Sequence, residues 1–104
     1  MRANFELKAH CADLELARER ARELATAWLG VDEQVRREIA LYENVRIHLD
    51  RVEGLGTFIE LGAVCDGDDA GLAAQERSVA CLRGRLGVRD VDLIAGSEET
   101  LLGA

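Results

Sequence analysis

The feature that most constrains the fold is residues 44–64, where two segments alternate between apolar and polar side chains and meet across a glycine-containing turn. In the first segment apolar Ile47 is followed by His48, and in the second apolar Ile59 is followed by Glu60. Successive side chains of a β-strand point to opposite faces, so each strand has one apolar and one polar face. Glycines supply the positive φ angles that a hairpin connection needs. The stretch therefore predicts a β-hairpin with one ionic face.

Length and charge limit what the chain can be. It has 104 residues, and 13 Lys and Arg against 20 Asp and Glu give a net charge of −7. A chain of this size supports one core, so we expect one domain over residues 1–104. The acidic balance argues against nucleic acid as a partner, because phosphate neutralisation needs a concentrated basic patch.

No apolar run reaches the roughly 18 residues of a membrane span. With no signal-peptide pattern either, no membrane association and a cytoplasmic location are the default expectations.

The cysteines give no sign of a disulfide framework or a zinc site. Cys11, Cys65 and Cys81 are odd in number, widely spaced and without a CxxC pair, so we expect reduced thiols. A metal site built from His10, Cys11 and His48 is disfavoured, since single Cys and His residues near apolar faces are usually packing residues.

A helix is expected after Asp13, whose carboxylate can accept hydrogen bonds from the N–H groups of a first helical turn. Apolar residues then recur at spacings of three and four, which makes one buried stripe. The stripe consists of Leu14, Ala17, Ala21, Leu24 and Trp28. Gly30 is expected to end this helix in a left-handed conformation, with a loop at 31–34.

Other segments complete the expected secondary structure. Residues 4–8 and 35–42 alternate like half-buried strands, the second with Ile39 and Leu41 on its apolar side. A second helix is expected to end at Gly87, and the tail is expected to be a short helix or turn. The buried stripe of that second helix is Leu72, Val79, Leu82 and Leu86. The expected fold class is α+β, an antiparallel sheet of about four strands with two main helices packed on one face.

The polar residues of these strands should share the face that the helices leave uncovered. They are Asn4, Glu6, Lys8, Arg36, Arg46, His48, Asp50 and Glu60. Carboxylates hold hard divalent cations and basic groups hold phosphate oxygens, so a face with both suits a metal-bound phosphate. The alternating pattern alone is equally typical of a solvated face of an antiparallel sheet.

Two motifs in this order carry a resemblance to a known family. The segment NFELK at 4–8 resembles the ExExK signature of the CYTH family, which takes its name from class IV adenylate cyclase and thiamine triphosphatase. The segment NVRIHLDRVEGLGTFIEL at 44–61 resembles the late strands of that family, where an Arg-bearing strand, an Asp, a VEGLG turn and an F-x-E-x-E strand follow one another. The tail LGVRDVDLIAGSEETLL at 86–102 also resembles the C-terminal end of the family.

The resemblance implies a fold and an activity. CYTH proteins form a triphosphate tunnel, an antiparallel barrel whose inward Glu residues bind Mg²⁺ or Mn²⁺ and whose inward Lys and Arg residues hold a triphosphate. The family hydrolyses nucleotide, inorganic or organic triphosphates, or cyclises ATP. An active member would therefore be a metal-dependent triphosphate phosphohydrolase or a class IV adenylate cyclase. Carried onto this chain, the triphosphate contacts would be Lys8, Arg46 and Arg36 or Arg37, and the metal ligands Glu6, Glu60 and, less directly, Asp50.

The chain also departs from the family pattern. Asn4 replaces the first signature Glu, Gly62 replaces the last Glu of the late strand, and only residues 25–35 stand where the family has several further strands. A tunnel needs about eight strands, so we expect a truncated CYTH-like domain with weak or lost activity, and a homodimer that partly rebuilds the barrel. The alternative is a non-catalytic interaction or structural module that dimerises through its sheet, with Arg46 and Glu60 in surface ion pairs of little energetic weight.

Overall fold

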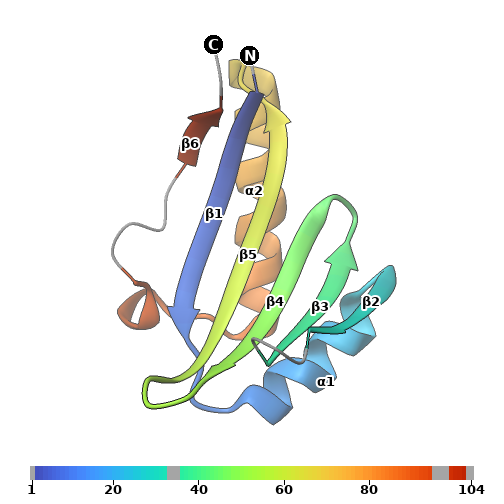
Figure 1. Cartoon of the computed structure of the whole chain (residues 1–104). Helices are drawn as coiled ribbons and strands as arrows, with labels where there is room; N and C mark the ends of the chain where they lie inside the picture. Colours follow the sequence, from blue (N-terminus) through green and yellow to red (C-terminus); the bar gives the residue numbers. More distant parts are fainter. Residues whose placement is uncertain (1, 33–35, 95–98, 103–104) are drawn as a thin grey trace.

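The protein is an α+β domain whose strands form one antiparallel sheet (Figure 1). It is described by a computed structural model that covers residues 2–32, 36–94 and 99–102. Its elements are β1 (Arg2–His10), α1 (Leu14–Leu24), β2 (Ala27–Asp32), β3 (Arg37–Tyr42), β4 (Val45–Val52), β5 (Gly56–Asp66), α2 (Asp69–Leu86), the 3-10 helix η1 (Asp90–Asp92) and β6 (Glu99–Leu102). In the described residues the sheet has six strands, where about four were expected, in the order β2-β3-β4-β5-β1-β6. None of the described helices combines the length and apolarity that crossing a bilayer requires.

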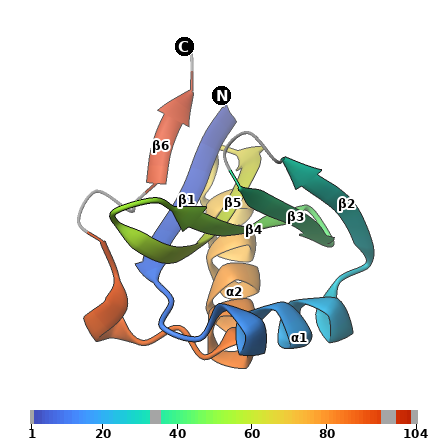
Figure 2. The same ribbon diagram turned by 60° about the horizontal axis from the view of Figure 1, so that its bottom comes forward.

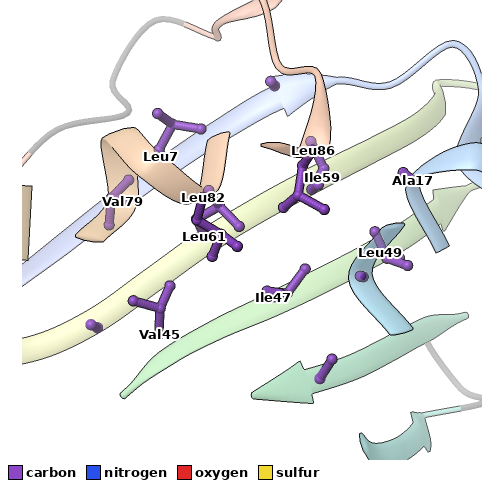
Figure 3. Close-up of a cluster of buried hydrophobic side chains, with 14 of the residues drawn as sticks. Leu7, Ala17, Val45, Ile47, Leu49, Ile59, Leu61, Val79, Leu82 and Leu86 are labelled. Atoms are coloured by element: carbon purple, nitrogen blue, oxygen red, sulfur yellow. The ribbon is translucent and has the colours of Figure 1, made fainter. Parts of the chain in front are cut away.

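Both helices pack on the same side of the sheet, as the sequence predicts, and in Figure 2 they lie together below it. The strand register brings Leu7, Leu61 and Ile47 into one cross-strand row on the face that the helices cover. Val79 and Leu82 of α2 belong to the same buried cluster (Figure 3). Burying an aliphatic side chain of this size contributes about 1.5–3 kcal/mol. This apolar face is what fixes the helices to the sheet.

The first helix is shorter than predicted, because β2 begins where the apolar stripe was expected to continue. Asp13 caps the helix as expected, its carboxylate accepting from the N–H of Leu16 at 3.0 Å. The helix ends at Leu24, and Trp28 lies in β2, where it pairs with Ala40. In the segment after Leu24 backbone hydrogen bonds to β3 take the place of helical ones. Its Thr, Trp and Val residues also favour strands. Gly30 is therefore not a helix cap. It lies next to the register shift in β2, with a φ of 117°. The loop predicted at 31–34 is wrong for Val31 and Asp32, which lie in β2, and 33–34 lie outside the described residues.

The faces of β3 are the reverse of the prediction. Ala40 pairs with Ile47, which puts Ala40, Glu38 and Tyr42 on the side that the helices cover. Ala40 is only 1% exposed, and its small side chain leaves room for α1. Arg36 therefore does not lie on the uncovered face, as expected, and Arg37 takes that place.

The second helix ends where it was predicted to end and departs from the prediction in one buried position. Asp68 caps its start, and Gly87 ends it with a φ of 76°. Gln75 is buried on its inner side, while Leu72 is only half-buried. The amide of Asn44 donates to Oε1 of Gln75 at 2.8 Å, which explains the polar residue there. The tail, expected to be a helix or turn, contributes β6, which pairs with β1.

We expect Gly87→Ala to lower the free energy of unfolding by about 1–2 kcal/mol, the cost of a left-handed backbone for a residue with a Cβ. A Cβ at Gly87 would also lie 2.6 Å from Nη1 of Arg20, so that side chain must move. Gly84→Ala is the matched control. Its Cβ would meet nothing within 4 Å, and an interior helical Gly→Ala change stabilises by about 0.5–1 kcal/mol. Urea unfolding of both variants measures the contrast, and equal shifts would contradict the assigned helix end.

Candidate functional site

The side of the sheet that the helices leave uncovered, called here the open face, collects the ionic residues. Its cross-strand rows are Glu6–Gly62–Arg46, Lys8–Glu60–His48 and His10–Phe58–Asp50–Arg37. All site residues predicted from the sequence lie in these rows except Arg36, which lines a separate hollow beside α1. Alternation along each strand is sufficient to bring the others together.

A hollow of about 330 Å³ opens on this face at the first two rows. It is lined by Glu6, Asn44, Arg46, His48, Glu60, Gly62 and Ala63. Gly62 pairs with Glu6 on one side and with Arg46 on the other. Since glycine has no side chain, the space between the carboxylate and the guanidinium stays open. Gly62 thus forms part of the floor of the hollow.

Arg46 supplies a cation at this hollow that no carboxylate neutralises. Its side chain is exposed, and within the described part of the chain it forms no ion pair or side-chain hydrogen bond. A guanidinium presents several N–H donors in a fork that matches phosphate and carboxylate oxygens. Arg46 is therefore available to bind an anion.

Glu60 and His48 form the second row of the hollow. Oε1 of Glu60 lies 3.5 Å from Nδ1 of His48, too long for a strong hydrogen bond. The neighbouring imidazole lowers the pKa of Glu60, followed by the charges of Arg37 and Lys8, while partial burial opposes the shift. Glu60 is therefore ionised at neutral pH. Nδ1 of His48 is buried and has no hydrogen-bond partner among the described atoms.

Arg37 and Asp50 form a two-point ion pair in the last row. Nε of Arg37 lies 2.7 Å from Oδ1 of Asp50, and Nη2 lies 2.9 Å from Oδ2. Asp50 is only 4% exposed, and both of its oxygens are engaged. This pair has the geometry of a structural contact, since a buried carboxylate without its cation is strongly unfavourable.

The predicted metal ligands do not converge on one point. Two strands and four residues separate Glu6 from Asp50, which on an ideal sheet is roughly 16 Å. Mg²⁺ holds its ligands at about 2.0–2.1 Å, so one ion cannot reach both carboxylates. In the described ranges no group of three or more His, Cys, Asp or Glu side chains is placed to hold a metal ion. These residues therefore do not fit a preformed Mg²⁺ or Mn²⁺ site of three carboxylates.

His48, Asn44 and Gly62 line the hollow, although the CYTH resemblance assigns none of them a ligand contact. Alternation with Arg46 on one strand had already placed His48 on this face. Lys8, predicted as a phosphate contact, lies in the same row as Glu60 and His48 but outside the residues that line the hollow, with its ammonium 5.4 Å from the centre of the Phe58 ring.

Comparisons with known proteins give a fold and no function. No model of a known protein family matches the chain, and no curated protein matches it. The chain is similar to the solved structure of a conserved hypothetical protein from Pyrococcus furiosus, with a TM-score of 0.67 and 12% sequence identity. The match covers 88% of this chain and 94% of the other. At this identity the similarity shows a shared fold alone.

We expect Glu60→Gln to make stability less dependent on pH in the acid range. The pKa of Glu60 in the folded state lies below its usual 4.5, so the unfolded chain takes up this proton first as the pH falls. Its contribution is complete above that usual value and is lost as the pH falls through the folded-state pKa. Urea unfolding at neutral pH and below pH 4.5 measures the slope. Glu53→Gln, in the exposed turn after β4, is the control, and equal slopes in both variants would contradict the expectation.

Proposed function

We propose that the open face binds a triphosphate or a similar polyphosphate chain, and that the protein is a reduced CYTH-like relative of triphosphate-processing enzymes with weak or lost catalysis. The observation that carries this proposal is the hollow in which, within the described part of the chain, Arg46 forms no ion pair and Nδ1 of His48 has only a 3.5 Å contact with Glu60. A phosphate oxygen between them would accept from the guanidinium and, when Nδ1 carries a proton, from the imidazole.

Unsatisfied hydrogen-bonding groups give the energetic reason for binding an anion here. A buried polar atom without a partner costs about 1–3 kcal/mol, and a ligand oxygen at His48 would remove that cost. Lys8 and Arg37 lie in adjoining rows and add positive charge near Glu60. The donors thus follow one another across the face, which suits an extended anion better than a single phosphate.

Binding is the proposed activity, and no catalytic step is assigned. Glu6 and Glu60 are the carboxylates beside the hollow, one strand and two residues apart. They do not form a metal site of their own, so the proposed contacts are made by the basic side chains of the chain.

We expect tripolyphosphate to bind in the presence of a chelator, because the donors belong to the protein. Arg46→Gln should weaken binding by at least about tenfold, since a hydrogen bond to a charged group contributes about 1.5–3 kcal/mol. Isothermal titration calorimetry with and without Mg²⁺ or Mn²⁺ measures both effects. Arg77→Gln, exposed on α2, removes the same charge on the far side of the sheet and should leave binding unchanged. No binding by the wild type, or equal binding by Arg46→Gln, would exclude the open face as the site.

One observation favours a second function, the dimerisation module. The described sheet ends at β2, whose outer edge has no neighbouring strand, and Leu29 on it is 48% exposed. A strand edge presents unpaired N–H and C=O groups that a second copy can pair with.

For this candidate we expect the wild type to form a dimer that dissociates on dilution. Leu29→Lys should remain monomeric, because a charged side chain on an edge strand opposes pairing. Sedimentation equilibrium over a range of concentrations distinguishes the two states. A wild type that is monomeric throughout that range would rule out β2 as a dimer interface.

A further inference from the structure

A second hollow, called here the arginine hollow, lies on the opposite side of the sheet, between α1 and strands β2 to β4. It has a volume of about 410 Å³ and is lined by Leu14, Arg18, Val31, Arg36, Glu38, Leu49 and Arg51. Clefts of about 300–1,000 Å³ are the usual size of small-molecule sites. The proposed polyphosphate site uses none of these residues, so the two hollows are independent.

Arg36 and Arg51 face each other across two strands at the rim of this hollow. The N–H of Arg51 donates to the carbonyl of Arg36 at 3.1 Å. The preceding cross-strand pair, Arg37 and Asp50, lies on the open face, so alternation sends Arg36 and Arg51 to the helix side. Like charges directly opposite on a sheet repel each other. Arg36 also has a φ of 50°, an unfavourable backbone conformation for a residue with a Cβ.

Across the described ranges, neither Arg36 nor Arg51 forms an ion pair or a side-chain hydrogen bond. Arg18 engages both nearby acids, with Nε 2.6 Å from Oε2 of Glu38 and Nη1 2.5 Å from Oε1 of Glu15. The hydrogen bond from Arg18 lowers the pKa of Glu15, and the charge of Arg51 also helps to lower it, an attraction without an ion pair. In a chain with a net charge of −7, two neighbouring arginines without an ion pair in the described residues are an unusual local excess of positive charge. They suit a bound anion.

The rest of the hollow is apolar. Leu14 and Leu49 belong to the buried core, and Val31 at the mouth is 57% exposed, a large aliphatic surface left in water. A fully hydrated anion such as free phosphate would gain nothing from these groups. Leu14 and Leu49 are already buried, at 6% and 1% exposed, so a ligand with an apolar body would gain mainly by covering Val31.

We infer that the arginine hollow binds a small organic acid with a carboxylate head and an aliphatic tail. The head accepts hydrogen bonds from the guanidinium groups of Arg36 and Arg51, and the tail packs against Val31, Leu14 and Leu49. The ion pair between Arg18 and Glu38 forms the polar end of the hollow and stays intact. The carboxylate thus provides a counter-charge between the two arginines, with which the described residues form no ion pair.

The test is calorimetric titration of the full chain with decanoate, decanol and acetate. Decanoate should bind at least tenfold more tightly than decanol, which lacks the charge, and than acetate, which lacks the tail. Arg36→Gln and Arg51→Gln should each weaken decanoate binding about tenfold, the loss of a hydrogen bond to a charged group. Arg77→Gln is the matched control and should bind decanoate like the wild type. Decanoate should also raise the unfolding temperature of the wild type by mass action.

Folding is measured separately, because loss of structure would also abolish binding. Each arginine substitution removes a like-charge contact, so the unfolding midpoint without ligand should not fall. Decanol binding as tightly as decanoate would overturn the inference, and so would unchanged decanoate binding in both variants. Tripolyphosphate or acetate binding as tightly as decanoate, and lost in the same variants, would also overturn it by showing an anion site without an apolar part. The Arg46→Gln result bears only on the open face.

Discussion

The cross-strand register of β1, β5 and β4 is the constraint on which the rest of the structure depends. Leu7, Leu61 and Ile47 form one row under the helices, and the same register places Lys8, Glu60 and His48 in a row on the other side. A slip of one residue would exchange the two faces and bury the ionic row against the helices. The free energy that drives core burial therefore also assembles the open face. The candidate site needs no separate source of stability to hold its residues together.

The parts of the fold that were predictable are those where one pattern admits one structure. The hairpin at 44–64 alternates without interruption, and caps such as Asp13 and Gly87 have few alternatives. In β3 both faces carry apolar residues, so alternation could not choose between Ile39 and Ala40. The choice is made by tertiary contacts, the close approach of α1 and the ion pair from Arg18. The end of α1 was predicted wrongly for the same reason. The spacing of four between Leu24 and Trp28 is compatible with a helix, and only the pairing of β2 with β3 decides against it.

The candidate site was predictable in its residue types and less so in its pairings. Alternation places Glu60 and Arg46 on one face, but it cannot show that Asp50 is held at two points by Arg37 and is therefore not available as a metal ligand. Gly62 shows the same limit. By the CYTH resemblance it is a glycine where a carboxylate is expected, whereas in the structure it leaves the space that separates Glu6 from Arg46. The function of a position depends on what its neighbours across the sheet leave open, and those neighbours are distant in sequence.

Charge on the open face limits how a polyphosphate could be held there. The cations Lys8, Arg37 and Arg46 face an equal number of carboxylates, Glu6, Asp50 and Glu60, and the chain as a whole is acidic. Long-range attraction is therefore weak, and salt would screen what remains of it. Recognition must come from short-range contacts, above all from the exposed guanidinium of Arg46 and from the imidazole of His48, whose Nδ1 has only a 3.5 Å contact with Glu60 among the described residues. A face built in this way selects an anion by the positions of its oxygens rather than by its total charge, and it favours a modest affinity over a tight one.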